Sequence, residues 1–153
     1  MKKIIFFLNK NFPMHSVLSI GENDDFLHEI THILRLQRYD PIREHHKIVH
    51  PLFMNKKYAW CAGPGYGILP GLDKTGMNNV LDNMGKHANH IFFYQDTDKN
   101  DAFWEERWMT RDFLHLPDMT DWIRRQPDLP DMYKKIMIFK KNIDKPARCG
   151  LQL

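Results

Sequence analysis

The apolar residues of this chain fall into short runs separated by clusters of Pro, Gly, Asn and Asp. The run Ile4 to Leu8 holds five residues, and no stretch approaches the roughly 20 apolar residues that a membrane span requires. Short runs of β-branched and aromatic residues form buried strands, whereas apolar residues about 3.6 positions apart form one face of a helix. The pattern therefore predicts strands and amphipathic helices that share a core.

Several segments can be assigned on this basis. After Gly21 a group of acidic residues favours a helix N-terminus, and Phe26, Ile30 and Leu34 lie on one side of the helix that follows. Pro51 indicates an edge strand. The predicted segments are a strand over 4–8, a strand over 16–20, a helix over about 24–37, a hairpin of strands 47–54 and 57–62, a helix over about 75–88 and a strand over 90–95.

This order of strand, helix, hairpin, helix and strand is the split βαβ plan of a ferredoxin-like sandwich. The predicted fold class is therefore α+β, with an antiparallel sheet and helices on one face. Residues 97–153 are expected to add a C-terminal helical segment and one strand. Because the chain has 153 residues and no linker rich in Gly or Ser, we expect one domain over 1–153, with its core in 1–96 and an extension over 97–153.

Charge and cysteine content bear on the partners and the compartment. The net charge of +3 is too small to indicate a polyanion partner by itself. Residues 96–132 hold ten acidic against five basic residues, and 133–153 hold six basic against one acidic, so the basic tail is expected to lie on the acidic segment or on a polyanion. Cys61 and Cys149 have no metal or redox spacing, and the run 4–8 is too short for an export signal, so we expect a cytoplasmic protein that binds no membrane.

The stretch "FLHEITHIL" over 26–34 contains the pattern His-Glu-x-x-His. On a helix, residues four apart lie one turn apart on the same face, so His28 and His32 could present two imidazoles to one zinc ion. Glu29 would then act on a metal-bound water, whose pKa the metal lowers to about 7. Two histidines on the polar face of an amphipathic helix are also ordinary surface residues.

Over these five residues the chain resembles the zincin metallopeptidases. The resemblance implies zinc as cofactor, His28 and His32 as ligands and Glu29 as general base. A third ligand is needed, and "REHHKIVH" over 43–50 offers Glu44, His45, His46 and His50, of which we select His46. The leading functional hypothesis is therefore a small cytoplasmic metal-dependent hydrolase that acts on a small-molecule or peptide substrate.

The loop "CAGPGYGILPGLDKTG" leads from a predicted strand into a predicted helix. Backbone N–H groups of Gly65 and Gly67 could approach a phosphate, and a helix beginning near Lys74 and Thr75 would favour an anion. The sequence is not a Walker motif, because Asp73 stands where the second glycine should be. Alternatively, the glycines and prolines simply build a stiff turn with Asp73 or Thr75 as the helix cap.

Two further segments, 96–100 and 101–122, are candidates for binding. Asp96, Asp98 and Asn100 follow the strand over 90–95 and could hold Mg²⁺. Alternatively, Asn100 or Asp101 could cap the next helix. The segment 101–122 is dense in Trp and Phe beside acidic residues, which favours packing in the core or at a protein interface over nucleic-acid binding.

Two alternatives to the hydrolase are therefore kept. One is a non-catalytic ferredoxin-like module that binds a nucleotide or nucleic acid through the Gly-rich loop 63–76 and basic strands. The other is a protein-interaction factor that uses the aromatic and acidic segment 101–122. A homo-oligomer is compatible with each of these hypotheses, because the sequence does not fix the oligomeric state.

Overall fold

The computed structural model describes residues 2–21 and 24–142, which form a mixed six-stranded sheet with helices. The strand order is β2-β1-β3-β4-β6-β5. The neighbours β2-β1, β1-β3 and β3-β4 are parallel, whereas β6 runs antiparallel to both β4 and β5. The strands are β1 (Ser16–Ile20), β2 (Arg38–Ile42), β3 (Tyr58–Gly63), β4 (Ala88–Phe93), β5 (Phe113–His115) and β6 (Met137–Lys141).

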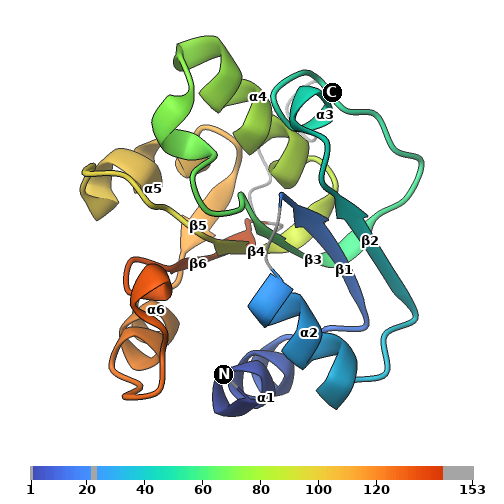
Figure 1. Cartoon of the computed structure of the whole chain (residues 1–153). Helices are drawn as coiled ribbons and strands as arrows, with labels where there is room; N and C mark the ends of the chain where they lie inside the picture. Colours follow the sequence, from blue (N-terminus) through green and yellow to red (C-terminus); the bar gives the residue numbers. More distant parts are fainter. Residues whose placement is uncertain (1, 22–23, 143–153) are drawn as a thin grey trace, which may run out of the picture.

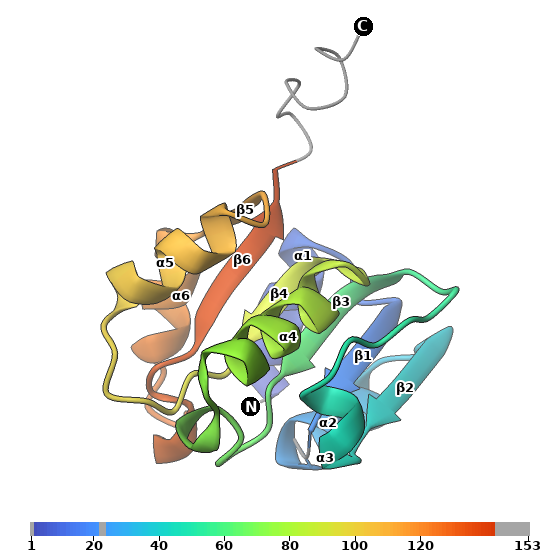
Figure 2. The same ribbon diagram turned by 90° about the horizontal axis from the view of Figure 1, so that it is seen from above.

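Helices cover both faces of this sheet (Figure 1). They are α1 (Lys2–Asn11), α2 (Asp24–Ile33), α3 (His45–Ile48), α4 (Lys74–Gly85), α5 (Asp101–Met109) and α6 (Pro117–Arg124), with short 3₁₀ helices η1 (Leu69–Gly71) and η2 (Asp131–Tyr133). One face carries α1, α2 and α6, and the other carries α3, α4 and α5. Seen from above, α4 lies over β3 and β4, and α5 lies beside β5 (Figure 2). No helix within the described residues has the length and hydropathy of a membrane span.

The strands divide the core into two hydrophobic clusters because successive side chains point to opposite faces. In β4, Phe92 packs on the face of α1 and α2, while Ile91 and Phe93 pack on the face of α4 and α5. In β6, Ile138 and Phe139 divide in the same way. Both clusters consist largely of fully buried side chains, so the sheet is covered on each side.

The segment Ile4 to Leu8 is part of helix α1, and the prediction of a strand there was wrong. A five-residue apolar run cannot be distinguished from a buried helical segment by periodicity. In α1 the buried residues are Ile4, Ile5 and Leu8, which lie on one helical face, whereas Phe6 is 49% exposed. The predicted strand at 16–20 is confirmed as β1.

The predicted hairpin over 47–62 was also wrong. Residues 47–48 end α3, an irregular segment follows, and β3 pairs in parallel with β1 and β4. The irregular segment pairs with no strand among the described residues, and side-chain amides form hydrogen bonds with its backbone instead. The buried Asn83 on α4 donates to the carbonyl oxygens of Ile48 and His50, and its Oδ1 accepts from the N–H of Leu52.

The α+β class is confirmed, but the ferredoxin-like split βαβ plan is not. The first four strands in sequence are parallel neighbours, and helices lie on both faces, which corrects the predicted antiparallel sheet with helices on one face. Strand β2 was not among the predicted segments, and it contains Pro41. Pro41 is tolerated there because β2 is an edge strand. Residues 97–142 add two helices and two strands, of which β6 pairs directly with β4.

Candidate functional site

The carboxyl ends of β1 and β3 define the point where the strand order reverses. The chain passes from β1 to β2 on one side and then returns to β3 on the other. Helix α2, after β1, and helix α4, after β3, lie on opposite faces of the sheet (Figure 1). In sheets of this kind, ligands bind outside the carboxyl ends of the strands at this reversal.

Glycine allows the two loops at this edge to approach each other closely. Gly21, after β1, has a φ of +87°, and a Cβ at this position would lie 2.5 Å from the backbone N of Gly65. The N–H of Gly65 donates to the carbonyl oxygen of Ile20. Gly63 has a φ of +150°, and a Cβ there would lie 2.5 Å from the same oxygen. The loop after β3 is therefore fixed against the end of β1.

The predicted phosphate-binding residues lie in this loop and at the start of α4. The N–H of Gly65 is used by Ile20, and the N–H of Gly67 donates to Oδ2 of Asp96. Lys74 and Thr75 open α4, where Asp73 is the N-cap and accepts from the N–H of Gly76. The two glycine N–H groups are therefore engaged by acceptors of the protein itself.

A pocket of about 350 Å³ lies beside this loop, next to the carboxyl end of β4. One part of its wall is apolar, and the other part is formed by the β4–α5 loop. The apolar part consists of Leu69, Pro70, Leu72, Met77, Phe103 and Trp104, and the loop contributes Asp96, Thr97, Asp98 and Lys99. Pockets that bind small molecules have this size and this mixture of apolar lining with few polar groups.

Several buried polar atoms near the end of β4 have no hydrogen-bond partner among the described residues. They are Oη of Tyr94, Nε2 of Gln95, Oδ1 of Asp96 and Nε1 of Trp104. Trp104 is 1% exposed, and both it and Asp96 line the pocket. A buried donor or acceptor without a partner costs about 1–3 kcal/mol, and native proteins contain few of them. Their concentration at one strand end distinguishes this part of the molecule.

The surroundings of the pocket are held in place by specific contacts. Nζ of Lys135, on the segment before β6, donates to the carbonyl oxygens of Thr97 and Lys99. Phe103 lies under two cations, with the guanidinium of Arg107 3.4 Å and Nζ of Lys99 5.3 Å from its ring centroid. Burial, together with the nearby carboxylate of Asp96, raises the pKa of Tyr94, so this phenol is neutral at physiological pH.

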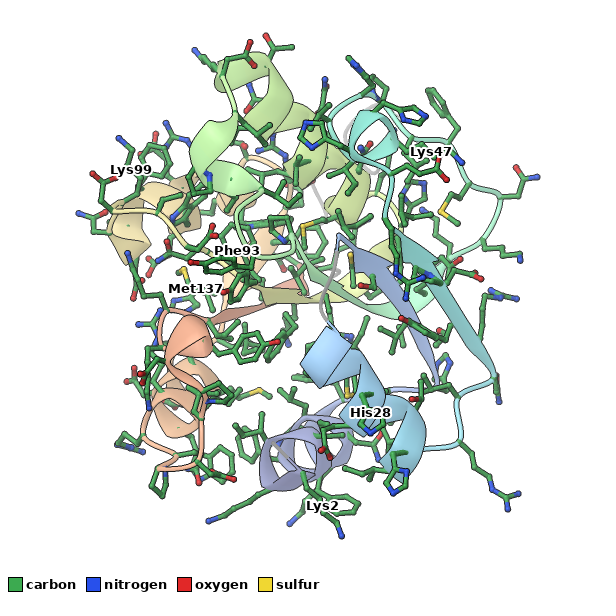
Figure 3. All side chains as sticks on the ribbon, viewed as in Figure 1. Lys2, His28, Lys47, Phe93, Lys99 and Met137 are labelled. Carbon is green, nitrogen blue, oxygen red and sulfur yellow. The ribbon has the colours of Figure 1, made fainter. Side chains whose placement is uncertain are left out.

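The HEITH motif lies on α2, on the other face of the sheet from this pocket, and His28 is on the outer side of the helix (Figure 3). The rings of His28 and His32 are stacked side by side, 6.0 Å apart, and both residues are exposed. Glu29 is half-buried. His46 lies on α3, on the opposite face of the sheet, so it is not brought to the same place as His28 and His32. Residues 2–21 and 24–142 contain no group of three or more His, Cys, Asp or Glu side chains arranged to hold a metal ion.

Most aromatic residues of the segment 101–122 are used inside the protein. Trp104, Trp108 and Phe113 are buried around Phe93 and Phe139 on the α4 and α5 face. Trp122 is half-buried and stacks on Phe7 of α1, with ring centroids 3.9 Å apart. These rings therefore stabilise the packing of α5 and α6 on the sheet, which is the core-packing alternative considered from the sequence.

Sequence analysis singled out some segments that line or adjoin the pocket, but it did not predict that they lie together. Asp96 and Asp98 were considered as Mg²⁺ ligands, and the Gly-rich loop was considered as a phosphate site. The aromatic residues of 101–122, Trp104 among them, were assigned to packing in the core or at a protein interface because their neighbours are acidic. A sequence does not show that the indole N–H of Trp104 lacks a partner among the described residues. The sequence did not indicate Leu69, Leu72 and Met77 as pocket residues, because apolar residues of this kind lie in a core more often than in a binding site. Comparisons with protein-family models and with curated proteins gave no match.

Proposed function

We propose that this protein binds a small planar nitrogen heterocycle, such as the base of a nucleoside or nucleotide, in the pocket beside the end of β4. The observation that carries the proposal is that two residues lining one pocket of small-molecule size each hold a buried, unpartnered polar atom: Nε1 of Trp104, a donor, and Oδ1 of Asp96, an acceptor. No reaction is part of the proposal.

A heterocyclic base has both the polar edge and the apolar face that the residues lining this pocket can bind. A base carries N–H donors and ring-nitrogen or carbonyl acceptors on one edge, so it can pair with a carboxylate and with an indole N–H at the same time. Its flat face is apolar enough to pack on Leu72, Met77 and Phe103. A ligand without an acceptor would leave the Trp104 N–H unpaired, and a ligand without a donor would leave Oδ1 of Asp96 unpaired.

Binding requires a small movement of the wall. Oδ1 of Asp96 and Nε1 of Trp104 are covered by neighbouring atoms, whereas Asp98 and Lys99 are exposed. The β4–α5 loop that carries Asp96 to Lys99 has no regular structure of its own before Asp101. In this proposal, a shift of the loop, which carries Asp96 and leads into α5, uncovers Oδ1 of Asp96 and Nε1 of Trp104 for the ligand.

A thermal-denaturation screen tests the proposal. The panel contains free bases, nucleosides and nucleotides, with benzoate and naphthalene derivatives of similar size as controls that lack ring nitrogen. A ligand at 100 times its dissociation constant stabilises the folded state by about 2.7 kcal/mol, which raises the Tm of a chain of this size by roughly 5–10 °C. Stabilisation by heterocycles, reduced in Asp96→Asn, supports the proposal. Equal stabilisation by the controls, or none by any heterocycle, contradicts it.

A further inference from the structure

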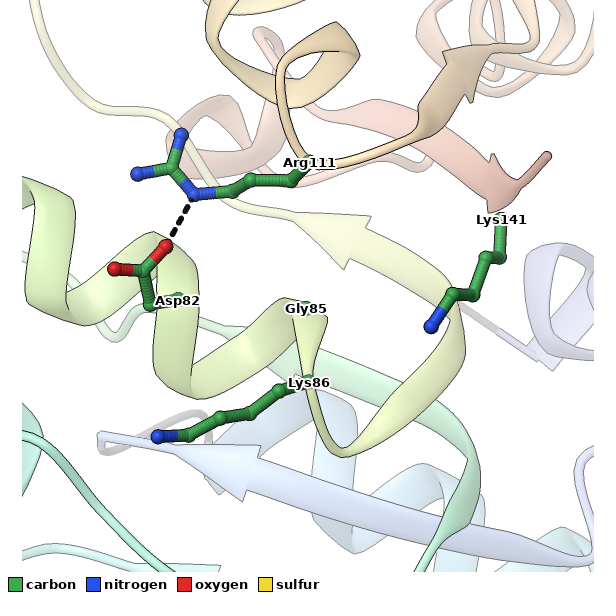
Figure 4. Close-up of a pocket in the computed structure, with 5 residues that line it drawn as sticks. All are labelled: Asp82, Gly85, Lys86, Arg111 and Lys141. Atoms are coloured by element: carbon green, nitrogen blue, oxygen red, sulfur yellow. Dashed lines mark hydrogen bonds and ion pairs between the residues drawn. The ribbon is translucent and has the colours of Figure 1, made fainter. Parts of the chain in front are cut away.

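A second surface, separate from the heterocycle pocket, runs between α4 and α5. Two adjoining hollows of about 480 and 350 Å³ share Asp82 and Arg111 as lining residues. The first is also lined by Lys74 and Arg107, and the second by Lys86 and Lys141 (Figure 4). We call this surface the α4–α5 groove. It has no lining residue in common with the pocket beside β4.

The groove carries an excess of positive charge. Five basic side chains line it, against the two carboxylates of Asp82 and Glu106. Asp82 is already paired, because Nε of Arg111 donates to its Oδ1 at 2.7 Å. Among the described residues, Lys74, Lys86 and Lys141 form no ion pair. Their positive charges are therefore available to an anionic partner.

The guanidinium of Arg111 is held rigidly in the floor of the groove. Its side chain is 16% exposed, and Nη1 donates to the carbonyl oxygen of Arg107 at 2.8 Å. Gly85 lies beside it on α4, where a Cβ would come within 3.2 Å of the ring of Phe113. The close packing of α4 on β5 thus forms the floor, and the lysines line the groove around it.

The length of the groove fits several phosphates rather than one. Lys74 and Lys86 are twelve positions apart at the two ends of α4, which corresponds to about 18 Å along the helix at 1.5 Å per residue. Even at the duplex spacing of about 3.4 Å per charge on one strand, this length spans at most about five phosphates, and an extended single strand places fewer there. A single small anion would leave most of these cations unused.

An exposed aromatic side chain stands at one end of the groove. Phe53 is 86% exposed, the largest value among the exposed large hydrophobic residues described, and Nζ of Lys86 lies 4.4 Å from its ring centroid. Lys56 and Lys57 are exposed next to it in sequence. Single-stranded nucleic acids are bound by such a combination of cations that follow the backbone and aromatic rings on which bases stack. An acidic peptide or a lipid headgroup has no base that could stack on the ring of Phe53.

We propose that the α4–α5 groove, with Phe53 at its end, binds single-stranded nucleic acid through its phosphate backbone and by base stacking. About four phosphate contacts give a fall in affinity of roughly 50-fold between 50 and 200 mM salt. Because the backbone dominates, binding depends little on base sequence. Stacking on Phe53 contributes about five-fold or more to the affinity.

The test is a fluorescence-anisotropy titration with a labelled 20-nucleotide oligothymidine. The combined variant Lys74→Glu, Lys86→Glu and Lys141→Glu is expected to bind at least tenfold more weakly at 50 mM salt, and Phe53→Ala at least fivefold more weakly. The matched control is Lys2→Glu, Lys10→Glu and Lys134→Glu, which makes the same charge change at exposed lysines outside the groove and should lose less than threefold.

Three results would overturn the proposal. The first is no binding by the parent protein at 50 mM salt, and the second is an equal loss in the groove and control variants. The third is binding to vesicles containing phosphatidylserine without binding to the oligonucleotide, which would assign the groove to a membrane surface. Thermal denaturation of each variant in the absence of oligonucleotide confirms that it is folded at the temperature of the titration.

Discussion

The backbone N–H of Gly67 donates a hydrogen bond of 2.6 Å to Oδ2 of Asp96. This bond joins the Gly-rich loop after β3 to the end of β4. It also fixes the carboxylate so that one oxygen is used by the protein, while the other, Oδ1, has no partner among the described residues. The pocket that we assign to a heterocyclic ligand is therefore shaped by a contact between two loops that are 29 residues apart in sequence.

The two loop glycines should respond differently to substitution. Gly21→Ala places a Cβ at 2.5 Å from the backbone of Gly65, so we expect it to lower the free energy of unfolding by more than about 3 kcal/mol or to prevent folding. Gly67 also has a positive φ, but a Cβ there meets nothing within 4 Å. Gly67→Ala should therefore cost only the backbone strain, about 1–2 kcal/mol. Urea denaturation measures both, and equal effects would contradict the close contact between the loops.

Asn83 is expected to be important for stability although it does not line the pocket beside β4. Asn83→Ala leaves two carbonyl oxygens and the N–H of Leu52 without their partners, so it should lower the free energy of unfolding by about 2–4 kcal/mol. Asn79, one turn earlier on α4, makes a single bond to the carbonyl oxygen of Val49 and serves as the control. Asn79→Ala should cost about 1 kcal/mol. A smaller loss of stability in Asn83→Ala than in Asn79→Ala would contradict the role of the Asn83 hydrogen bonds in holding the segment after α3.

The ion pair between Asp101 and Arg124 predicts a dependence of stability on pH. The guanidinium donates to both carboxylate oxygens, at 2.8 and 3.1 Å, and this hydrogen bonding lowers the pKa of Asp101. Because the folded-state pKa is lowered, the stabilisation is complete above the ordinary carboxyl pKa near 4 and is lost as the pH falls through the lower folded value. The pair is partly exposed, so Asp101→Asn should cost only about 1 kcal/mol at pH 7. In denaturation curves, the difference between parent and variant should shrink as the pH is lowered below the ordinary carboxyl pKa, and a difference that grows on acidification would contradict this sign.

The metal-dependent hydrolase stays a prediction from the sequence. Elemental analysis of the purified protein and of His28→Ala tests it directly. About one zinc per chain, lost in the variant, would support a site that His28 and His32 complete with a further ligand, and Glu29→Gln should then abolish hydrolysis while zinc stays bound. The absence of metal from both samples would leave the exposed, stacked His28 and His32 as surface residues.

The helices with a clear apolar stripe and a capping residue could be predicted from the sequence. The predicted helix over about 75–88 corresponds to α4 at Lys74–Gly85, with Asp73 as its cap, and the strand over 90–95 corresponds to β4. Asn100 caps α5, as one of the two readings of that segment suggested. In these cases local side-chain chemistry and the apolar period indicate the same structure.

The errors have a common physical origin. Two short apolar runs, 4–8 and 47–54, take their structure from contacts with distant parts of the chain. The first becomes a helix because it buries one face of α1 in the core. The second is held by the side-chain amide of Asn83 on α4. Parallel pairing of β1 with β3 is likewise set by residues about 40 positions apart. The pocket depends on the same long-range contacts, because the Gly67 N–H reaches Asp96 only when β3 and β4 are neighbours.

Calorimetric titration of two tryptophan variants tests the central claim. Trp104 and Trp108 lie one turn apart on α5, both are buried, and both have an indole N–H without a partner among the described residues, but only Trp104 lines the pocket. With the heterocycle that gives the largest thermal stabilisation, Trp104→Phe should bind at least tenfold more weakly than the parent, and Trp108→Phe within threefold of it. Equal binding by the two variants would contradict the assignment of this pocket as the ligand site.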